Sequence, residues 1–321
     1  KFSGEGYKPY KIETKNFHEI KKSISSKKIA FIDGGNAEIL SSANLSLSLI
    51  RICYVVYQNN KKIETKKFEI LAFIEAINEN NEISFKISFF KTKNPMELEG
   101  MCFSSFDPTL MFGINRAEIS SVANTIRRFA ELRLAKLIAE GKVSDVIVLD
   151  GNLQKTLTNE GKYLNEIYDS CNKNNIILSA LSKTTSLFAD NGNLLSVVLD
   201  NISKFQAWFY HPIVEINSAN HKAEMFFAKF HNKSKHVFRF EIFKEHKAMA
   251  EEAISGLACN CNDPIFLGYP YGLIEADRIA RVSNHEKESL KTIVLIKLKN
   301  KNVEKHLSSI NAHEILDKIS F

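Results

Sequence analysis

Cysteine, glycine, proline and long apolar runs are all scarce in this chain of 321 residues. Its five cysteines are odd in number and include no Cys-x-x-Cys pair, which disfavours a disulfide framework and a structural zinc site. With 13 glycines and 6 prolines, a fibrous or loop-dominated protein is also disfavoured. No apolar run approaches the roughly 18 residues of a membrane span, and residues 1–28 lack the apolar core of a signal peptide. We therefore expect a cytoplasmic protein with reduced thiols and no membrane contact. Because the first residue is Lys, we expect the chain to begin inside a longer gene product.

The overall composition is that of a globular protein. Hydrophobic residues make up 44% of the chain and charged residues 25%, which permits a sizeable core. The length fits one large domain or two small ones. The net charge of +6 permits an anionic partner such as nucleic acid without demanding one.

Two stretches share one pattern, an apolar run that ends in Asp followed by Gly. Residues 29–35 read Ile-Ala-Phe-Ile-Asp-Gly-Gly, and residues 146–151 read Val-Ile-Val-Leu-Asp-Gly. Such runs predict strands buried on both faces, which places Asp33 and Asp150 at the carboxyl ends, where α/β sheets bind ligands. Two neighbouring carboxylates repel each other unless a divalent cation neutralises them. Asp-Gly is also an ordinary turn signal, but its repetition in the same context favours a metal site.

The remaining pattern predicts a mixed α/β chain. Residues 1–28 are expected to form a basic lead-in, residues 29–321 a single domain, and residues 92–115 an inserted loop near the site. We expect further strands over about 46–57, 63–74, 83–90 and 176–181, and short aromatic-rich strands at 195–199, 206–210, 222–230 and 237–243 within an extra β segment, 194–243. We expect helices over 116–140, 162–174, 244–257 and 273–282, a short helix near 18–23, and a partly helical tail at 287–321.

The element order is that of the ribonuclease H fold: three strands, a helix, a strand, a helix, a strand and a later helix. We therefore predict a ribonuclease-H-like mixed sheet flanked by helices. In that fold, acids end the first and fourth strands, a third lies on the first helix and a fourth group comes from the last helix. Asp33 and Asp150 fit the strand positions. Glu131 borders the apolar stripe of the 116–140 helix and is the candidate for the third acid. The alternative is that Glu131 is an exposed residue on the helix surface, which is the more common case for a Glu in a helix. Glu118 is discounted because it lies in the first turn, where it favours the helix dipole.

Several segments in order resemble NurA nucleases. The resemblance rests on Phe31-Ile32-Asp33-Gly34-Gly35, Arg127-Arg128-Phe129-Ala130-Glu131-Leu132, Val148-Leu149-Asp150-Gly151, Ser182-Lys183-Thr184-Thr185, Val237-Phe238-Arg239-Phe240-Glu241 and Gly268-Tyr269-Pro270-Tyr271-Gly272-Leu273-Ile274-Glu275-Ala276-Asp277. It implies manganese-dependent cleavage of DNA, with 5′–3′ exonuclease and single-strand endonuclease activity. It also implies a homodimer that docks on a hexameric HerA-type ATPase in DNA end resection and double-strand break repair.

The resemblance also implies the ligand set. Asp33, Glu131, Asp150 and Asp277 are carried over as metal-binding acids, the last at a position where some members of the family have His. Oxygen-only ligands suit Mn²⁺ or Mg²⁺, and two ions roughly 4 Å apart would serve phosphodiester hydrolysis. Lys183 follows the 176–181 strand, so it is predicted to be catalytic as a phosphate contact, with a solvated Lys as the alternative.

Two other functions are compatible with this fold. A sugar-kinase or actin-superfamily phosphotransferase uses the same type of sheet and Asp-Gly motifs, although those motifs usually have a residue between Asp and Gly. A non-catalytic DNA-binding subunit is the other alternative, and the intact acids speak against it. The Lys-rich segment 229–247, which includes Lys233, Lys235 and Arg239, is the densest candidate for holding DNA.

Overall fold

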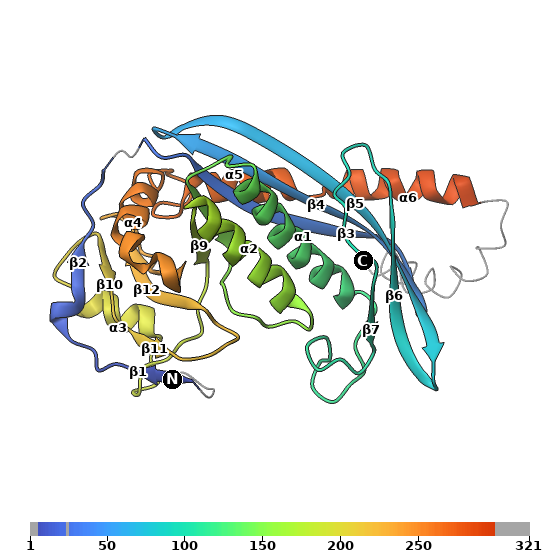
Figure 1. Cartoon of the computed structure of the whole chain (residues 1–321), viewed down its shortest axis with the longest axis horizontal. Coiled ribbons are helices and arrows are strands. Elements are labelled where there is room, and N and C mark those ends of the chain that lie inside the picture. The colour runs from blue at the N-terminus through green and yellow to red at the C-terminus, as the bar shows by residue number, and fades with distance from the viewer. Residues whose placement is uncertain (1–5, 24–25, 299–321) are drawn as a thin grey trace, which may run out of the picture. The chain divides into compact units, whose positions relative to one another are not determined.

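The computed structural model describes residues 6–23 and 26–298 (Figure 1). The strands are β1 (Tyr7–Pro9), β2 (Phe17–Glu19), β3 (Ile29–Ser42), β4 (Leu45–Gln58), β5 (Lys61–Glu79), β6 (Glu82–Phe90), β7 (Met101–Ser104), β8 (Val146–Asp150), β9 (Ile177–Ser182), β10 (Trp208–Tyr210), β11 (Val214–Ile216), β12 (Ala223–Lys229) and β13 (Phe238–Phe243). The helices are α1 (Ser121–Glu140), α2 (Glu160–Asn174), α3 (Leu195–Ile202), α4 (Ala250–Cys259), α5 (Tyr271–Ala280) and α6 (Asn284–Leu298), with 3₁₀ turns η1 (Thr14–Asn16) and η2 (Lys244–Met249).

The strand order confirms the predicted mixed sheet. Within the described residues, an 11-stranded sheet has the order β2-β10-β12-β13-β9-β8-β3-β4-β5-β6-β7, and β1 pairs with β11 separately. The stretch β5-β4-β3-β8-β9 is the ribonuclease H order, with the first strand of that fold, β3, in the middle. β8 is parallel to both β3 and β9, whereas β13 is antiparallel to β9. The centre of the sheet therefore has parallel strands whose carboxyl ends share one edge.

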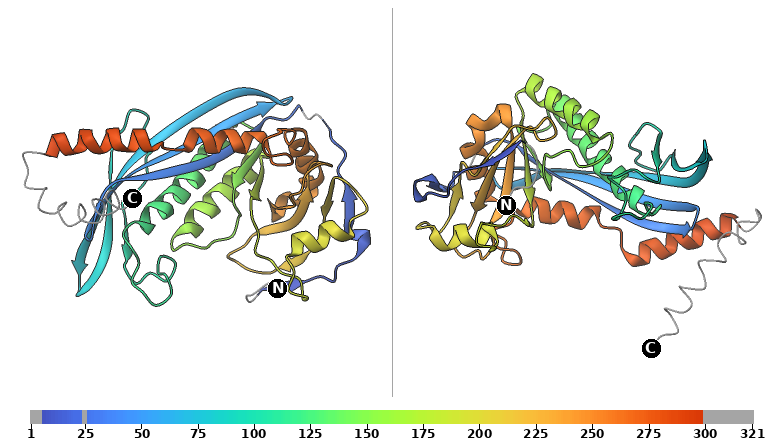
Figure 2. Two further views of the ribbon diagram at one scale, coloured as in Figure 1. Left: turned by 180° about the vertical axis from the view of Figure 1, so that it is seen from behind. Right: turned by 90° about the horizontal axis from the view of Figure 1, so that it is seen from below.

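Contacts divide the chain into two units. Of the described residues, unit 1 comprises 6–23, 26–33, 53–66 and 131–279, and unit 2 comprises 34–52, 67–130 and 280–298. The long strands β3, β4 and β5 contribute residues to both units, as does α1 (Figures 1 and 2). Every predicted site residue belongs to unit 1.

The core of unit 1 follows from its apolar strands. Residues 146–149 of β8 and 177–181 of β9 are buried, as expected for strands covered on both faces. α2 and the second half of α1 lie side by side, with Lys136 Nζ 3.0 Å from Glu166 Oε2 (Figure 1). A second cluster gathers Trp208 and aromatic side chains of β2, β10 and β12. This second cluster stabilises the outer strands of the sheet, which β13 separates from β9.

In unit 2, a helix packs on the strands. Leu290 and Val294 of α6 lie against Ile39 and Leu49 of β3 and β4. Arg51 of β4 is only 4% exposed and is held by the carboxylates of Glu69 and Glu286. A buried guanidinium needs such partners, because leaving it unpaired would be costly.

Two expected elements are wrong, and both errors have a tertiary cause. The predicted helix near 18–23 is absent: Phe17–Glu19 forms β2, since Phe17 packs edge-on against Trp208 of the adjacent β10. The predicted strand at 195–199 is helix α3, in which the buried residues Leu195 and Leu199 lie one turn apart. The extra segment 194–243 therefore contains a helix as well as strands.

Several boundaries also differ. The expected inserted loop, 92–115, contains the short strand β7, and the 244–257 helix begins as the 3₁₀ turn η2 before α4. In the expected tail, 287–298 belong to α6 and 299–321 lie outside the described residues. None of the helices in the described part of the chain is both long and apolar enough to cross a membrane. All five cysteines are free thiols.

Candidate active site

Strand register places Asp33 beside Asp150. β3 and β8 pair in parallel with Ile32 opposite Leu149, so the next residue on each strand is an acid. Residues in register on adjacent strands point to the same face of a sheet. β9 continues the pairing, with Asp150 opposite Leu181, and Lys183 follows two residues later. The strand pattern thus brings two carboxylates and an ammonium group to one sheet edge.

Lys183 is the cation at the centre of this group. Its Nζ lies 2.7 Å from Asp150 Oδ2 and 3.5 Å from Asp277 Oδ1. Burial lowers the pKa of Lys183, but the charges of Asp150, Asp33 and Asp277 outweigh that effect, and the pKa lies above its ordinary value. Three predicted acids therefore surround one positive charge.

Tyr269, which lies just before α5, contacts the same group of residues. Its ring is fully buried and stacks on Phe266, with ring centroids 4.9 Å apart, which excludes stacking on a DNA base. Its hydroxyl donates to Asp150 Oδ1 at 3.4 Å. Burial, followed by the charges of Asp150, Asp33 and Asp277, raises the pKa of Tyr269. The phenol therefore stays protonated and serves as a hydrogen-bond donor.

Helix α5 is seated so that Asp277 joins the group. Gly272 lies so close to the Phe31 ring that an added Cβ would be 2.1 Å from Phe31 Cδ2. Glu275 is buried and accepts hydrogen bonds from Tyr57 Oη at 2.5 Å and Lys62 Nζ at 2.7 Å. Gly272 therefore packs on Phe31 of β3, and Glu275 is bound by Tyr57 of β4 and Lys62 of β5, so that both contacts hold α5 in place.

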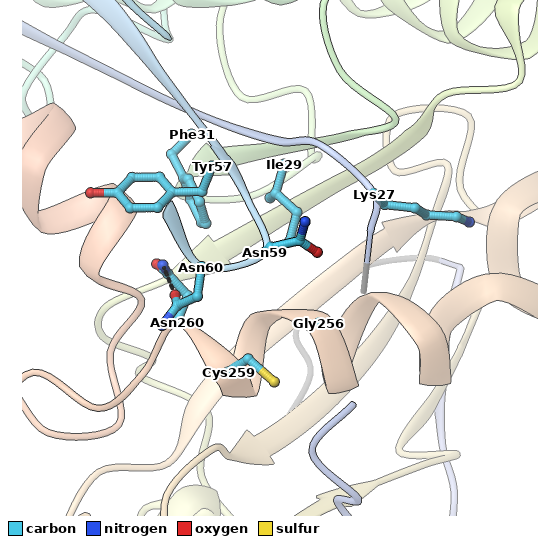
Figure 3. Close-up of a pocket in the computed structure, with 9 residues that line it drawn as sticks. All are labelled: Lys27, Ile29, Phe31, Tyr57, Asn59, Asn60, Gly256, Cys259 and Asn260. Atoms are coloured by element: carbon cyan, nitrogen blue, oxygen red, sulfur yellow. Dashed lines mark hydrogen bonds between the residues drawn. The ribbon is translucent and has the colours of Figure 1, made fainter. Parts of the chain in front are cut away.

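Asn260 fixes the start of the same helix. Its carbonyl accepts from the Tyr271 amide and its Oδ1 accepts from the Gly272 amide, each at 2.8 Å. Its Nδ2 donates to Asn60 Oδ1 at 2.9 Å (Figure 3). The two asparagines border a hollow, whose other lining residues are Lys27, Ile29, Phe31, Tyr57, Asn59, Gly256 and Cys259. Since this lining includes no carboxylate, the hollow is not the site of the acids.

Glu131 lies on α1 and is only 7% exposed, so the reading as an exposed surface residue is wrong. Across residues 6–23 and 26–298, no three Asp, Glu, His or Cys side chains are arranged to hold a metal ion as they stand. The cation among Asp33, Asp150 and Asp277 is the Lys183 ammonium. The role of Glu131 as a ligand stays a prediction.

The donor chemistry nevertheless fits a hard divalent cation. Asp33, Asp150 and Asp277 supply only carboxylate oxygens, which suit Mg²⁺ and Mn²⁺. Asp150 and Asp277 already lie within 3.5 Å of the Lys183 ammonium, and Asp33 is next to Asp150 in the strand register. The convergence of acids at the end of parallel strands is thus compatible with metal binding.

The comparison with protein families decides the identification. The NurA domain matches residues 27–282, most of the chain. The protein belongs to the NurA family. This confirms the resemblance, which rested on motifs spread over the same region.

A solved structure shares the fold of this NurA chain. The crystal structure of the NurA nuclease from Sulfolobus solfataricus has a TM-score of 0.56 at 16% identity, and the match covers 89% of this chain and 88% of that one. The catalytic domain of human endonuclease V matches with a TM-score of 0.42 at 12% identity, over 82% of this chain and 84% of that one. Among curated proteins, none matches this chain.

The least expected part of this NurA fold is a buried charge cluster around Glu241. Arg239 was predicted to help hold DNA, but it turns inward and donates to Glu241 Oε1 at 2.6 Å through its Nε. His221 Nε2 lies 3.1 Å from Glu241 Oε2, and the Leu153 amide donates to that oxygen at 2.8 Å. Burial raises the pKa of Glu241, but His221, Arg239 and the Leu153 amide outweigh it and lower the pKa to about 2. Glu241 is therefore ionised in the core.

Proposed function

We propose that this chain is a metal-dependent deoxyribonuclease that hydrolyses phosphodiester bonds. The observation that carries the proposal is the convergence of Asp33, Asp150 and Asp277 on Lys183 at the end of the parallel strands. Membership of the NurA family supports it, as does the likeness in fold to a protein described as a nuclease.

Each site residue has a role in the proposed chemistry. Asp33, Glu131, Asp150 and Asp277 would hold Mn²⁺ or Mg²⁺, and two such ions would supply an activated water and stabilise charge on the phosphate. Lys183 would leave Asp150 and contact a phosphate oxygen as a point charge. The protonated Tyr269 hydroxyl holds Asp150 Oδ1, which fixes the orientation of that carboxylate.

The finer assignment follows the family resemblance. We propose 5′–3′ exonuclease and single-strand endonuclease activity in DNA end resection and double-strand break repair. We also propose that the chain forms a homodimer and acts with a hexameric HerA-type ATPase. Light scattering at micromolar concentration tests the dimer, because a monomer would contradict it, and co-purification with a HerA-type ATPase tests the partnership.

The decisive experiment compares Asp33→Asn and Asp150→Asn with the wild-type chain on labelled single- and double-stranded DNA. Each reaction contains Mn²⁺, Mg²⁺, Ca²⁺ or excess chelator. The wild type should cleave only with Mn²⁺ or Mg²⁺, and each variant should lose at least 100-fold in rate. Glu224→Gln is the control, because Glu224 pairs with His211 and Lys247 on another part of the sheet. Cleavage that persists in chelator, or variants with near-normal rates, would overturn the proposal.

The same experiment separates the alternatives. A phosphotransferase of the sugar-kinase and actin type would leave DNA intact and consume ATP, so an ATP-turnover arm is included. A non-catalytic subunit would bind DNA without cleaving it under any metal condition. The carboxylates gathered at Lys183 favour the nuclease over a non-catalytic subunit, since a chain without catalytic activity has no need of mutually repelling carboxylates. The ATP-turnover arm separates the nuclease from the phosphotransferase.

A further inference from the structure

Four hydrogen bonds tie down the short segment that follows Asp150. The Gly151 amide donates to the Leu181 carbonyl at 3.0 Å, and the Ser182 hydroxyl donates to the Gly151 carbonyl at 2.7 Å. Two residues later, the Leu153 amide donates to Glu241 at 2.8 Å, and the Tyr168 hydroxyl donates to the Leu153 carbonyl at 3.0 Å. Gly151 has a φ of +110°, a conformation that L side chains rarely adopt, so a glycine is required where the chain leaves the strand.

Glu241 stands out in this set because it is a fully buried charge. β13 pairs with β9 so that Arg239 lies opposite Ser182 and Glu241 lies opposite Ala180. The carboxylate therefore reaches from the strand beside Lys183 to the loop after Asp150. A buried ion pair costs desolvation energy and often contributes little net stability. Its hydrogen bond to the loop after Asp150 indicates that Glu241 positions this loop rather than stabilises the fold.

We propose that Glu241 is a positioning residue that holds the 151–153 loop, and thereby the Asp150 carboxylate, in the geometry that metal binding requires. This inference rests on the proposed function. Glu241 has no contact with the reacting atoms in this scheme and acts through the backbone of Leu153. Arg239 donates to the Glu241 carboxylate and keeps it ionised and oriented, His221 lies beside it, and Tyr7 Oη, 2.9 Å from His221 Nδ1, extends the network to β1.

Two variants loosen the loop from opposite sides. Glu241→Gln keeps the size of the side chain but removes the charge that orients it. Tyr168→Phe removes only the hydroxyl that holds the Leu153 carbonyl, and its ring can remain stacked on Phe243, with centroids 4.3 Å apart. Glu224→Gln is the matched control, since it removes a carboxylate charge from the neighbouring strand β12, where Glu224 pairs with His211 and Lys247.

The first measurement is Mn²⁺ binding by calorimetry, followed by the rate of cleavage at saturating Mn²⁺. Removing a group that orients a ligand typically weakens metal affinity by about 10- to 100-fold. We expect that loss in Glu241→Gln, a smaller loss in Tyr168→Phe, and wild-type affinity in Glu224→Gln. A purely structural role would lower the unfolding midpoint and leave the Mn²⁺ affinity of the folded protein unchanged.

The second measurement is hydrogen exchange of peptides covering residues 148–157, which depends on neither metal nor activity. The Leu153 amide should exchange about 10-fold faster in Glu241→Gln and at the wild-type rate in Glu224→Gln. Unchanged exchange and unchanged Mn²⁺ affinity in a folded Glu241→Gln would overturn the proposal. If that variant does not fold, wild-type values in Tyr168→Phe would overturn it instead. If the wild-type chain binds no Mn²⁺, the proposed function fails, and the exchange arm still decides whether Glu241 holds the loop.

Discussion

Replacing Gly272 by Ala should destabilise the protein even though Ala is the better helix former. Gly272 lies in the first turn of α5, and a Cβ there would be 2.1 Å from Phe31 Cδ2 and 2.4 Å from Cε2. Carbon atoms normally approach to about 3.5 Å, so the ring or the helix must move by more than an ångström. Phe31 is fully buried in the central strand β3 and has little room to move. The helix that carries Asp277 must therefore shift.

The two opposing energies can be compared. Gly to Ala in a helix interior gains about 1 kcal/mol, and less in the first turn. Overpacking a well-filled core costs about 1–3 kcal/mol. The expected net result is a loss of about 1–2 kcal/mol in the free energy of unfolding, together with weaker Mn²⁺ binding because Asp277 is displaced.

Urea unfolding at neutral pH measures this loss, with Gly161→Ala as the control. Gly161 lies in the first turn of α2, where an added Cβ meets only the flexible Lys155 side chain, the nearest atom at 3.3 Å. The control should match or exceed wild-type stability. If Gly272→Ala is as stable as the wild type, the contact between α5 and Phe31 does not have the energetic role assigned to it.

Three further predictions concern charge. Because the pKa of Glu241 is about 2 in the folded chain and about 4.5 when unperturbed, its contribution is complete above pH 4.5 and is lost as the pH falls towards 2. A difference of 2.5 units corresponds to about 3 kcal/mol, so urea unfolding between pH 6 and pH 2.5 should show a smaller pH dependence in Glu241→Gln than in the wild type. Lys183→Met should bind Mn²⁺ several-fold more tightly in calorimetry yet cleave DNA more slowly, since it removes a competing cation from Asp150; weaker Mn²⁺ binding would contradict this. Neutralising the exposed pair Lys233 and Lys235 should flatten the salt dependence of single-strand binding in Ca²⁺ by about 0.7 per lost phosphate contact on a log–log plot, and an unchanged slope would show that neither holds DNA.

The strands and two of the acids could be predicted because their signals are local. An Ile- and Val-rich run followed by Asp-Gly fixes both the burial of a strand and the residue at its end, and the parallel register then aligns Asp33 with Asp150. The elements that were wrong have weaker local signals. Residues 195–199 are rich in Leu and Val, as a strand would be, yet Leu195 and Leu199 are the pair that becomes buried, which needs a helix. Phe17 forms a strand because of Trp208, far away in the sequence.

The support around the acids could not be predicted, because it depends on partners that the sequence does not reveal. Arg239 and Glu241 alternate with aromatic residues on a strand, a pattern that predicts charges facing solvent. Glu241 instead meets the Leu153 amide 88 residues away, and Tyr269 meets Asp150 119 residues away. Both side chains are fully buried, so the charged or polar group of each needs a partner inside the protein. The partners of Glu241 and Tyr269 both lie in the short segment from Asp150 to Leu153. These two contacts link the buried polar network to the candidate catalytic strand, β8.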